Sequence, residues 1–501
     1  MKNTAINKMI FLTAVIAIAS FATTVCAQDT LAPQTGTMKG AVLKGRAPVS
    51  KQILRVKLPK AQEATLKNGL RVVVLENHRV PTFSMEMVVM SGGLSDPADM
   101  HGLAGATATL LREGTAKHNS RELAEQLDTI GATIGANSAL AGFTTSITAA
   151  GLVENFDQVL DLFTEVVRTP KFPTEEVDRY KSRTVSAQGQ IRGQAGFLAQ
   201  ERLNQAIYGT HPASLVLPPA EGIKRMTQAD LMRFHDQNYV PNNAMLAIVG
   251  DVKLKEILPK LESAFGNWKQ GAAPATVVPA VPAQPDAKIY LINRPGSVQT
   301  VFQIGALGIE RTDPDYAAMA VMNRILGGGG SSRLFLNIRE DKSYAYSVGS
   351  SFNSSKYRGT FVANAPVRTD ATEGALREFM SEFNRIRNEK VSANELENAK
   401  RSIVGGFALS LENPGQLLQN IITQKLYGMP ANYWDTYPQK VESITADDVQ
   451  RVAQKYIDLG HLQIVAVGDA SKTREVLAKF GTVVEFDGDG KPMRTASKTG
   501  Q

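Results

Sequence analysis

Four segments of this chain recur in the same order further along it, and this repetition constrains the fold more than any other feature. The earlier and later copies are separated by 217 to 219 residues in every pair. The pairs are Ser95-Asp96-Pro97 with Thr312-Asp313-Pro314, 172–185 with 391–404, 226–231 with 444–449, and 245–252 with 462–470. This period is far too long for a solenoid repeat. The pattern therefore predicts an internal duplication that produces two homologous domains.

The composition of the chain changes between the two copies. Residues 269–288 (KQGAAPATVVPAVPAQPDAK) are rich in Pro and Ala and have no helical period, which predicts a stiff linker. We therefore expect an N-terminal domain at 51–268, a C-terminal domain at 289–490 and a tail at 491–501.

Within one copy, the patterns typical of strands and helices are grouped rather than strictly alternating. Residues 84–90 predict a strand, and the apolar positions of 156–167 fall on one face of a helix. The pair Asn119 and Glu122 has the spacing of a capping box. Asp96-Pro97 and its copy each predict an N-cap followed by proline at the first helical position. This grouping favours an α+β fold in which helices pack on a sheet in each domain.

Residues 1–27 have the pattern of a secretory signal peptide. Two lysines precede the apolar run MIFLTAVIAIASFA, and small residues surround a cleavage point expected after Ala27. Cleavage there removes Cys26, the only cysteine, and lowers the net charge from +7 to +5 because those two lysines leave with it. We therefore expect a periplasmic protein without disulfides, with residues 28–50 as a flexible arm. A charge this small does not indicate nucleic-acid binding, and no later stretch predicts a membrane span.

The residue types that usually carry catalysis are scarce in this chain. Its six histidines are at least 17 residues apart, so no pair has the i, i+4 spacing with which one helix presents two zinc ligands. His101 adjoins the helix expected at 102–115 but has no second ligand nearby. Glycines 327–330 lack the Lys-Ser/Thr ending of a phosphate-binding loop, so they indicate a helix end and a flexible turn. No serine-nucleophile elbow occurs either.

Residues 102–115 (GLAGATATLLREGT) predict a buried helix directly after a turn. Leu103, Thr107, Leu110 and Leu111 recur at helical spacing, and between Gly102 and Leu111 no side chain is titratable. Taken alone, such a helix indicates packing rather than chemistry.

One polar cluster stands out at 331–350 (SSRLFLNIREDKSYAYSVGS). If IRE ends a helix and YAYSV is a strand, Arg339 and Tyr346 converge at one end of the sheet. An arginine fork and a phenol are donors suited to a carbonyl or a developing oxyanion. The residues alone favour the simpler interpretation, in which the cluster is a surface ion pair together with a strand tyrosine.

Taken together, these segments resemble the zinc peptidases of the pitrilysin, insulin-degrading enzyme and mitochondrial processing peptidase family. The resemblance extends from about Leu66 to Phe486 and includes LKNGLRVVVLEN, SGGLSDP with the GLA–GT helix, and GGGGSSRLFLNIREDKSYAYSV. It implies a mostly antiparallel sheet in each domain and a clamshell-type half chamber. In that family the GLA–GT helix carries the inverted zinc motif H-x-x-E-H, with glutamate as the general base.

The resemblance places unsuitable residues at the zinc positions of this chain. Gly105, Ala108 and Thr109 occupy the motif, and the third ligand, a glutamate, falls near Gln188. We therefore expect no catalytic metal and no zinc chemistry in this chain. The family's Arg/Tyr pair, which binds substrate backbone and polarises the scissile carbonyl, matches Arg339 and Tyr346 by its spacing of seven.

A chain that matches the family's Arg/Tyr pair but lacks its zinc ligands is predicted to be a non-catalytic subunit of a heterodimeric periplasmic zinc peptidase. The partner would be a homologous subunit with H-x-x-E-H that supplies the zinc, while this chain binds the peptide substrate and completes the partner's site. The alternatives are a stand-alone peptide-binding or structural protein on a peptidase fold, and an autonomous metallopeptidase with unusual ligands.

Overall fold

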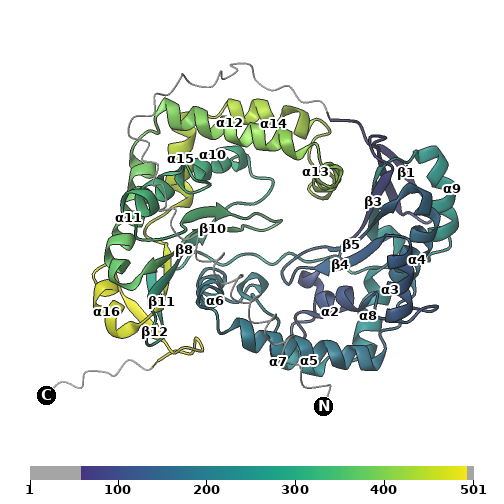
Figure 1. Cartoon of the computed structure of the whole chain (residues 1–501), viewed down its shortest axis with the longest axis horizontal. Coiled ribbons are helices and arrows are strands. Elements are labelled where there is room, and N and C mark those ends of the chain that lie inside the picture. Colours follow the sequence, from purple (N-terminus) through teal and green to yellow (C-terminus); the bar gives the residue numbers. More distant parts are fainter. Residues whose placement is uncertain (1–57, 494–501) are drawn as a thin grey trace, which may run out of the picture. The chain divides into compact units, whose positions relative to one another are not determined.

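The computed structural model describes residues 58–493, which contain both copies of the duplicated unit (Figure 1). The predicted signal peptide, the arm at 28–50 and the last eight residues of the tail lie outside this range. None of the helices at 58–493 is long and apolar enough to cross a lipid bilayer.

The first copy forms a six-stranded sheet in the order β1-β2-β6-β3-β5-β4. Only β2 and β6 pair in parallel, and the other neighbours are antiparallel. The central strand β6 is buried along its whole length, as expected for a continuous apolar run. The strands are β1 (Gln62–Thr65), β2 (Arg71–Glu76), β3 (Thr82–Val89), β4 (Thr133–Ser138), β5 (Thr145–Leu152) and β6 (Ala244–Gly250).

The second copy has the order β12-β7-β11-β8-β10-β9, which repeats the first sheet except at the edge, where β12 pairs with β7 in parallel and β1 pairs with β2 antiparallel. Its parallel pair β7–β11 corresponds to β2–β6, and the antiparallel order β11-β8-β10-β9 corresponds to β6-β3-β5-β4. The strands are β7 (Lys288–Asn293), β8 (Gln299–Leu307), β9 (Gly349–Phe352), β10 (Thr360–Arg368), β11 (Gln463–Gly468) and β12 (Val483–Phe486). The duplication and the mostly antiparallel α+β fold are thus confirmed, whereas the half chamber stays a prediction.

Helices cover the sheets in matching order in the two copies. The first copy contains α2 (Leu103–Leu110), α3 (Ser120–Thr129), α4 (Phe156–Arg168), α5 (Thr174–Ile191), α6 (Ala195–Tyr208), α7 (Ala220–Arg225), α8 (Gln228–Asn238) and α9 (Leu254–Phe265). The second contains α10 (Tyr316–Leu326), α11 (Thr372–Asn388), α12 (Ala393–Ser410), α13 (Pro414–Leu426), α14 (Tyr433–Glu442), α15 (Ala446–Tyr456) and α16 (Ala470–Ala478). The capping box at Asn119 and Glu122 is present at the start of α3.

Two helices pack on the sheet of the opposite copy. Helix α6 packs against β8 and β11, and Phe197, Leu203 and Ile207 join the apolar cluster of the second sheet. Helix α13 packs against β6 in the same way, with Leu418 and Ile422 among Val73, Val249 and other strand residues. Each sheet therefore has its own helices on one face and a helix of the other copy on the second face.

The helix starts after Asp96 and Asp313 differ from the prediction. Pro97 and Pro314 lie in turns, and the helices begin later, at Leu103 and Tyr316. The reason is that Asp96 caps a helix from a distance, as described below, and Asp313 accepts a hydrogen bond from the amide of Asp315 at 2.8 Å.

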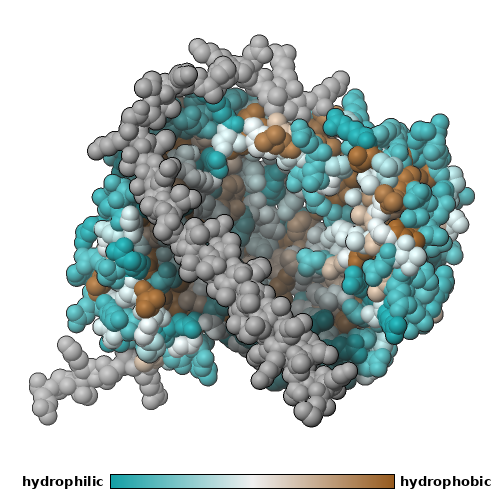
Figure 2. Space-filling model, viewed as in Figure 1, coloured by the Kyte–Doolittle hydropathy of each residue, from teal (hydrophilic) through white to brown (hydrophobic). Residues whose placement is uncertain are grey.

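The segment 269–288 has no helix or strand before Lys288, the first residue of β7. Side-chain hydrogen bonds connect it to residues of both copies. Thr276 Oγ1 donates to the carbonyl of Met90 at 2.9 Å, and Gln463 Nε2 donates to the carbonyl of Asp286 at 3.0 Å. Figure 2 shows a largely hydrophilic surface on the viewed face, with apolar residues in small groups.

Candidate functional site

The helix that lacks titratable residues, α2, begins at a closely packed glycine. Gly102 has φ +99, and a Cβ built on it would lie 2.6 Å from Cβ of Pro218. The left-handed conformation and the contact both require glycine at this position. The helix starts one residue later, with Leu103, Ala104 and Leu110 in the core of the first sheet.

Asp96 caps α2 from six residues before Gly102. Its carboxylate accepts hydrogen bonds from the amides of Gly102 at 2.6 Å and Ala104 at 2.7 Å, which otherwise have no partner at the helix start. Burial raises the pKa of Asp96 to about 7, and the amide hydrogen bonds lower it only in part. The duplicated Ser-Asp-Pro motif therefore positions this helix.

The three positions of the inverted zinc motif carry no metal-binding group. Gly105 has no side chain, and Ala108 is buried with 1% of its surface exposed. Thr109 is exposed, and its hydroxyl donates to the carbonyl of Gly105 at 2.8 Å within the helix. Glycine and alanine offer no donor atom, and a neutral hydroxyl bonded to its own helix is a poor zinc ligand.

Gln188 on α5 is buried, and its amide is already used in the fold. Its Nε2 donates to the carbonyl of Pro218 at 2.9 Å. Pro218 therefore contacts both Gln188 and the start of α2. The residues present do not fit a zinc ion, and at 58–493 no three His, Cys, Asp or Glu side chains gather as a metal site requires.

Arg339 lies on a π-helix, η5 (Phe335–Asp341). This geometry is rare and occurs often at functional sites. Asn337 Nδ2 ties the π-helix to α11 by donating to Glu378 Oε2 at 2.9 Å and to Glu382 Oε1 at 2.8 Å. The guanidinium carbon of Arg339 lies 4.6 Å from the ring centroid of Phe335. The sequence predicted a helix here but not its wider turn.

Tyr346 lies in a bend and not in the predicted strand. Residues 344–348 form only one isolated bridge, between Ala345 and Val367, and the strand β9 begins at Gly349. The structure nevertheless brings the predicted pair together, because the Arg339 guanidinium carbon lies 5.1 Å from the Tyr346 ring centroid. Tyr346 is 83% exposed, the largest fraction among the large hydrophobic side chains at 58–493.

A cavity of about 530 Å³ opens beside this pair. Its lining includes Gln299, Arg339, Ser343, Tyr346 and Arg368. Arg339 also contacts Glu340 across 3.4 Å, but its side chain remains 36% exposed. The guanidinium and the phenol therefore face solvent together, as donors available to a bound carbonyl.

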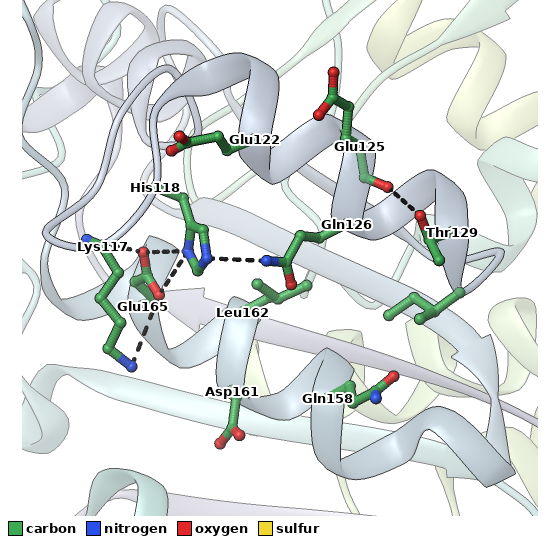
Figure 3. Close-up of a pocket in the computed structure, with 11 residues that line it drawn as sticks. Lys117, His118, Glu122, Glu125, Gln126, Thr129, Gln158, Asp161, Leu162 and Glu165 are labelled. Carbon is green, nitrogen blue, oxygen red and sulfur yellow. Dashed lines mark hydrogen bonds and ion pairs between the residues drawn. The ribbon is translucent and has the colours of Figure 1, made fainter.

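A second cavity, of about 560 Å³, lies between α3 and α4 and was not predicted from the sequence (Figure 3). His118, Glu122, Glu125, Asp161 and Glu165 line it together with glutamines and Lys117. The buried carboxylate of Glu165 is one of the lining groups. Sequence separation hid this group, since His118 and Glu165 are 47 residues apart.

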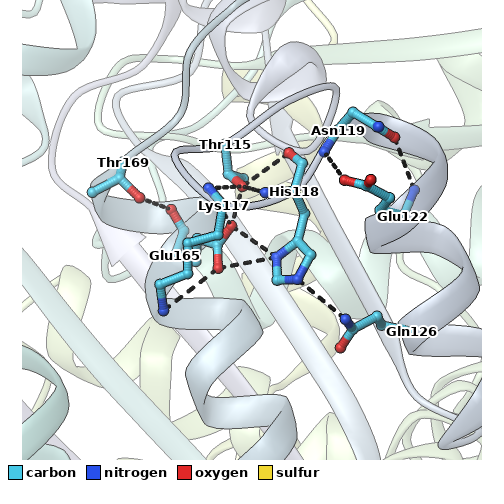
Figure 4. A network of polar contacts seen from close by, with 8 residues as sticks. All are labelled: Thr115, Lys117, His118, Asn119, Glu122, Gln126, Glu165 and Thr169. Carbon is cyan, nitrogen blue, oxygen red and sulfur yellow. Dashed lines mark hydrogen bonds and ion pairs between the residues drawn. The ribbon is translucent and has the colours of Figure 1, made fainter.

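The contacts of Glu165 are those of a structural network (Figure 4). Its carboxylate accepts from the Thr115 hydroxyl and from the amide of Lys117, and lies 3.0 Å from His118 Nδ1. His118 Nε2 lies 3.1 Å from Gln126 Nε2. These bonds tie the loop after α2 to α3 and α4. Glu165 therefore has a structural role, and Arg339 and Tyr346 are the stronger candidates for a functional site.

Comparisons with known proteins identify the family and the fold of this chain. Residues 71–218 match the family described as insulinase (peptidase family M16), and residues 225–403 match the peptidase M16 inactive domain. Two curated relatives are a probable mitochondrial-processing peptidase subunit beta from Arabidopsis thaliana and a non-peptidase homolog, YmxG, from Helicobacter pylori. Each is 23% identical, and the matches cover 82% and 80% of this chain and 78% and 93% of the relatives.

The fold also matches a solved structure over most of the chain. A crystal structure of a peptidase M16 inactive domain from Pseudomonas fluorescens is 28% identical and superposes with a TM-score of 0.76. The match covers 82% of this chain and 98% of that one. Two consecutive family domains and a duplicated sheet topology lead to one conclusion: this chain belongs to peptidase family M16, the insulinase family.

Proposed function

We propose that this chain is the non-catalytic subunit of a heterodimeric periplasmic zinc peptidase, which binds peptide substrate and completes the active site of its partner. One observation carries the proposal. The guanidinium carbon of Arg339 lies 5.1 Å from the ring centroid of Tyr346 at an open cavity. The helix that would hold zinc instead carries Gly105, Ala108 and Thr109. In this proposal the pair binds the peptide, whereas the three helix positions offer no group that binds the metal.

The proposed role of this chain is to bind and orient the substrate. The guanidinium of Arg339 offers several N–H donors in a fixed plane, and the phenol of Tyr346 offers one O–H donor. Both suit the carbonyl oxygen of an extended peptide, and both strengthen their bonds as negative charge develops on that oxygen. In this proposal the zinc, the general base and the attacking water belong to a homologous partner with H-x-x-E-H.

The relatives support the proposal by their names alone. The Arabidopsis relative is named as a subunit, so members of this family occur in assemblies. The Helicobacter relative is named a non-peptidase homolog, as expected of a chain without ligands on α2. The signal-peptide pattern at 1–27 supports the periplasmic location, which N-terminal sequencing of the mature protein would test by finding Gln28 first.

The decisive experiment is co-expression with a secreted homologue from the same organism that carries H-x-x-E-H. Arg339→Ala and Tyr346→Phe should each lower kcat/KM for an unfolded peptide by about 10² to 10³, as for loss of one donor to a developing oxyanion. Arg377→Ala is the matched control, since that surface arginine pairs with Glu373 on the same helix. Wild-type rates in both Arg339 and Tyr346 variants would refute the proposal.

A stand-alone peptide-binding or structural protein is the second candidate, favoured by the name of the Helicobacter relative. The two candidates differ in their dependence on a partner. A stand-alone protein migrates as a single species after co-expression and binds peptide without the homologue. A heterodimer co-purifies with the homologue and cleaves peptide only together with it.

A further inference from the structure

The turn that carries Tyr346 has little regular structure to hold it. It follows the π-helix η5, and Ser343 adopts φ +53, a left-handed conformation that is rare for a residue with a side chain. The amides of Ser343 and Tyr344 close the end of η5 on the carbonyls of Arg339 and Ile338. These bonds fix the start of the turn only.

Arg368, the last residue of β10, adds support next to the Ala345–Val367 bridge. Its Nη1 donates to the carbonyl of Ser343 at 2.9 Å, and its backbone amide donates to the carbonyl of Tyr344 at 3.1 Å. Its Nε and Nη2 meanwhile hold Asp370 at 3.1 and 3.3 Å. One side chain thus connects the turn, the end of β10 and the residue that follows it.

The place of Arg368 in the sheet makes it a firm support. β10 pairs with β8 along its whole length, and Arg368 lies opposite Gln299 at the edge of the cavity beside Arg339. Asp370 keeps the guanidinium in one orientation because it accepts two of its N–H groups. One N–H of Nη1 is thereby aimed at the Ser343 carbonyl, while the side chain as a whole is 56% exposed.

We infer that Arg368 is a positioning residue, which holds Tyr346 beside Arg339 so that the two donors meet a peptide together. The inference rests on the proposed function, because it assigns a support to the peptide-binding pair. Arg368 acts through the Ser343 carbonyl and needs no contact of its own with the substrate. Without it, we expect Tyr346 to sample many positions, so that the binding-competent turn becomes a minor population.

The test uses the whole chain, labelled with fluorotyrosine, and two readouts. The fluorine resonance of Tyr346 is assigned by its loss in Tyr346→Phe. In Arg368→Ala this resonance should narrow, and its chemical shift should move toward that of fluorotyrosine in an unfolded peptide. In Arg377→Ala the resonance should be unchanged. This first readout needs neither a partner nor a substrate.

The second readout is the binding of fluorescein-labelled casein, an unfolded polypeptide, to the same variants. Arg368→Ala should weaken binding about tenfold, as when the competent population falls to about one tenth. Arg368→Lys should recover part of the loss, since an ammonium donates to the Ser343 carbonyl but cannot hold Asp370 in two bonds. In a Tyr346→Phe background, Arg368→Ala should cost much less than in the wild type, because the two residues act in series.

The possible outcomes test the role of Arg368 and the proposed function separately. An unchanged Tyr346 resonance in Arg368→Ala overturns the inference, as does a tenfold loss that is equal in both backgrounds. If Arg339→Ala and Tyr346→Phe bind casein as the wild type does, the proposed function fails. The resonance then still decides whether Arg368 holds Tyr346.

Discussion

At the scale of single residues, the exposed Arg339–Tyr346 pair contrasts with the residues at the positions of the zinc motif. At these positions Gly105 has no side chain, Ala108 is buried, and the hydroxyl of Thr109 is bonded to the backbone of its own helix. Arg339 and Tyr346 remain exposed and lie side by side. A peptide-binding role needs only such exposed donors, whereas hydrolysis also needs a metal or a base.

The raised pKa of Asp96 predicts how the stability of the chain depends on pH. Its pKa is about 7 in the folded chain against an ordinary 3.8, so the folded state holds this proton more tightly than the unfolded state. Between about pH 4 and 7 the folded chain therefore binds more protons, and the contribution of Asp96 to the free energy of unfolding falls as the pH rises. Urea unfolding from pH 4 to 8 should show this decline, and Asp96→Asn should flatten it. An identical pH dependence in the variant would contradict the assignment.

At the scale of elements, the start of α2 depends on a tight backbone approach. Gly102 and Gly131 both have positive φ, +99 and +61, but only Gly102 has Pro218 where a Cβ would be. Helix α2 is therefore fixed to the loop that also receives the Gln188 amide.

These two glycines provide a matched pair of variants. Gly131→Ala should cost about 1 kcal/mol of unfolding free energy, the conformational term alone. Gly102→Ala should cost about 1 to 3 kcal/mol more, because Pro218 must move. Urea midpoints with equal m-values would measure both. Equal losses in the two variants would show that the Pro218 contact is unimportant.

The glycine-rich loop at 327–330 follows the end of α10 as predicted, and its first two glycines pack closely, which the sequence did not show. A Cβ on Gly327 would lie 2.3 Å from the amide of Ser350, and one on Gly328 would lie 2.8 Å from Cα of Arg324. Composition could not distinguish these cases, because glycine serves both flexibility and close approach.

At the scale of the whole molecule, the exchange of α6 and α13 makes the two copies dependent on each other. A buried carboxylate, Glu86 on β3, lies at one of these contacts and accepts from Ser146 and from Gln419 of α13. Burial raises its pKa, which the two hydrogen bonds only partly offset. Separation of the copies would expose this group together with the apolar residues around α13.

We therefore predict that the full chain unfolds in one transition although it contains two homologous sheets. Residues 51–268 expressed alone lack α13, so the face of the first sheet that includes Val73 and Val249 would be open to water. This fragment should bind a hydrophobic dye strongly, and the fragment 289–490 should relieve that binding when added. Calorimetry of the full chain would contradict the prediction if it showed two transitions that match the separate fragments.

Much of this organisation was predictable from the sequence, because its causes are local or repeated. The capping box of Asn119 and Glu122 is set by neighbours in the chain, and the offset of 217 to 219 residues reports the duplicated sheet. The absence of zinc ligands follows from residue identity alone once the motif is recognised. The spacing of Arg339 and Tyr346 gave the pair but not its geometry.

What only the tertiary structure decided are contacts between residues distant in sequence. The sequence could not place Asp96 on the amides of α2, Arg368 on the carbonyl of Ser343, or Glu165 beside His118. It also could not show that α6 and α13 cover the opposite sheets. Local patterns determine which elements form and which residues are available. Three-dimensional packing determines which groups meet, because hydrogen bonding and apolar burial depend on distance in space and not along the chain.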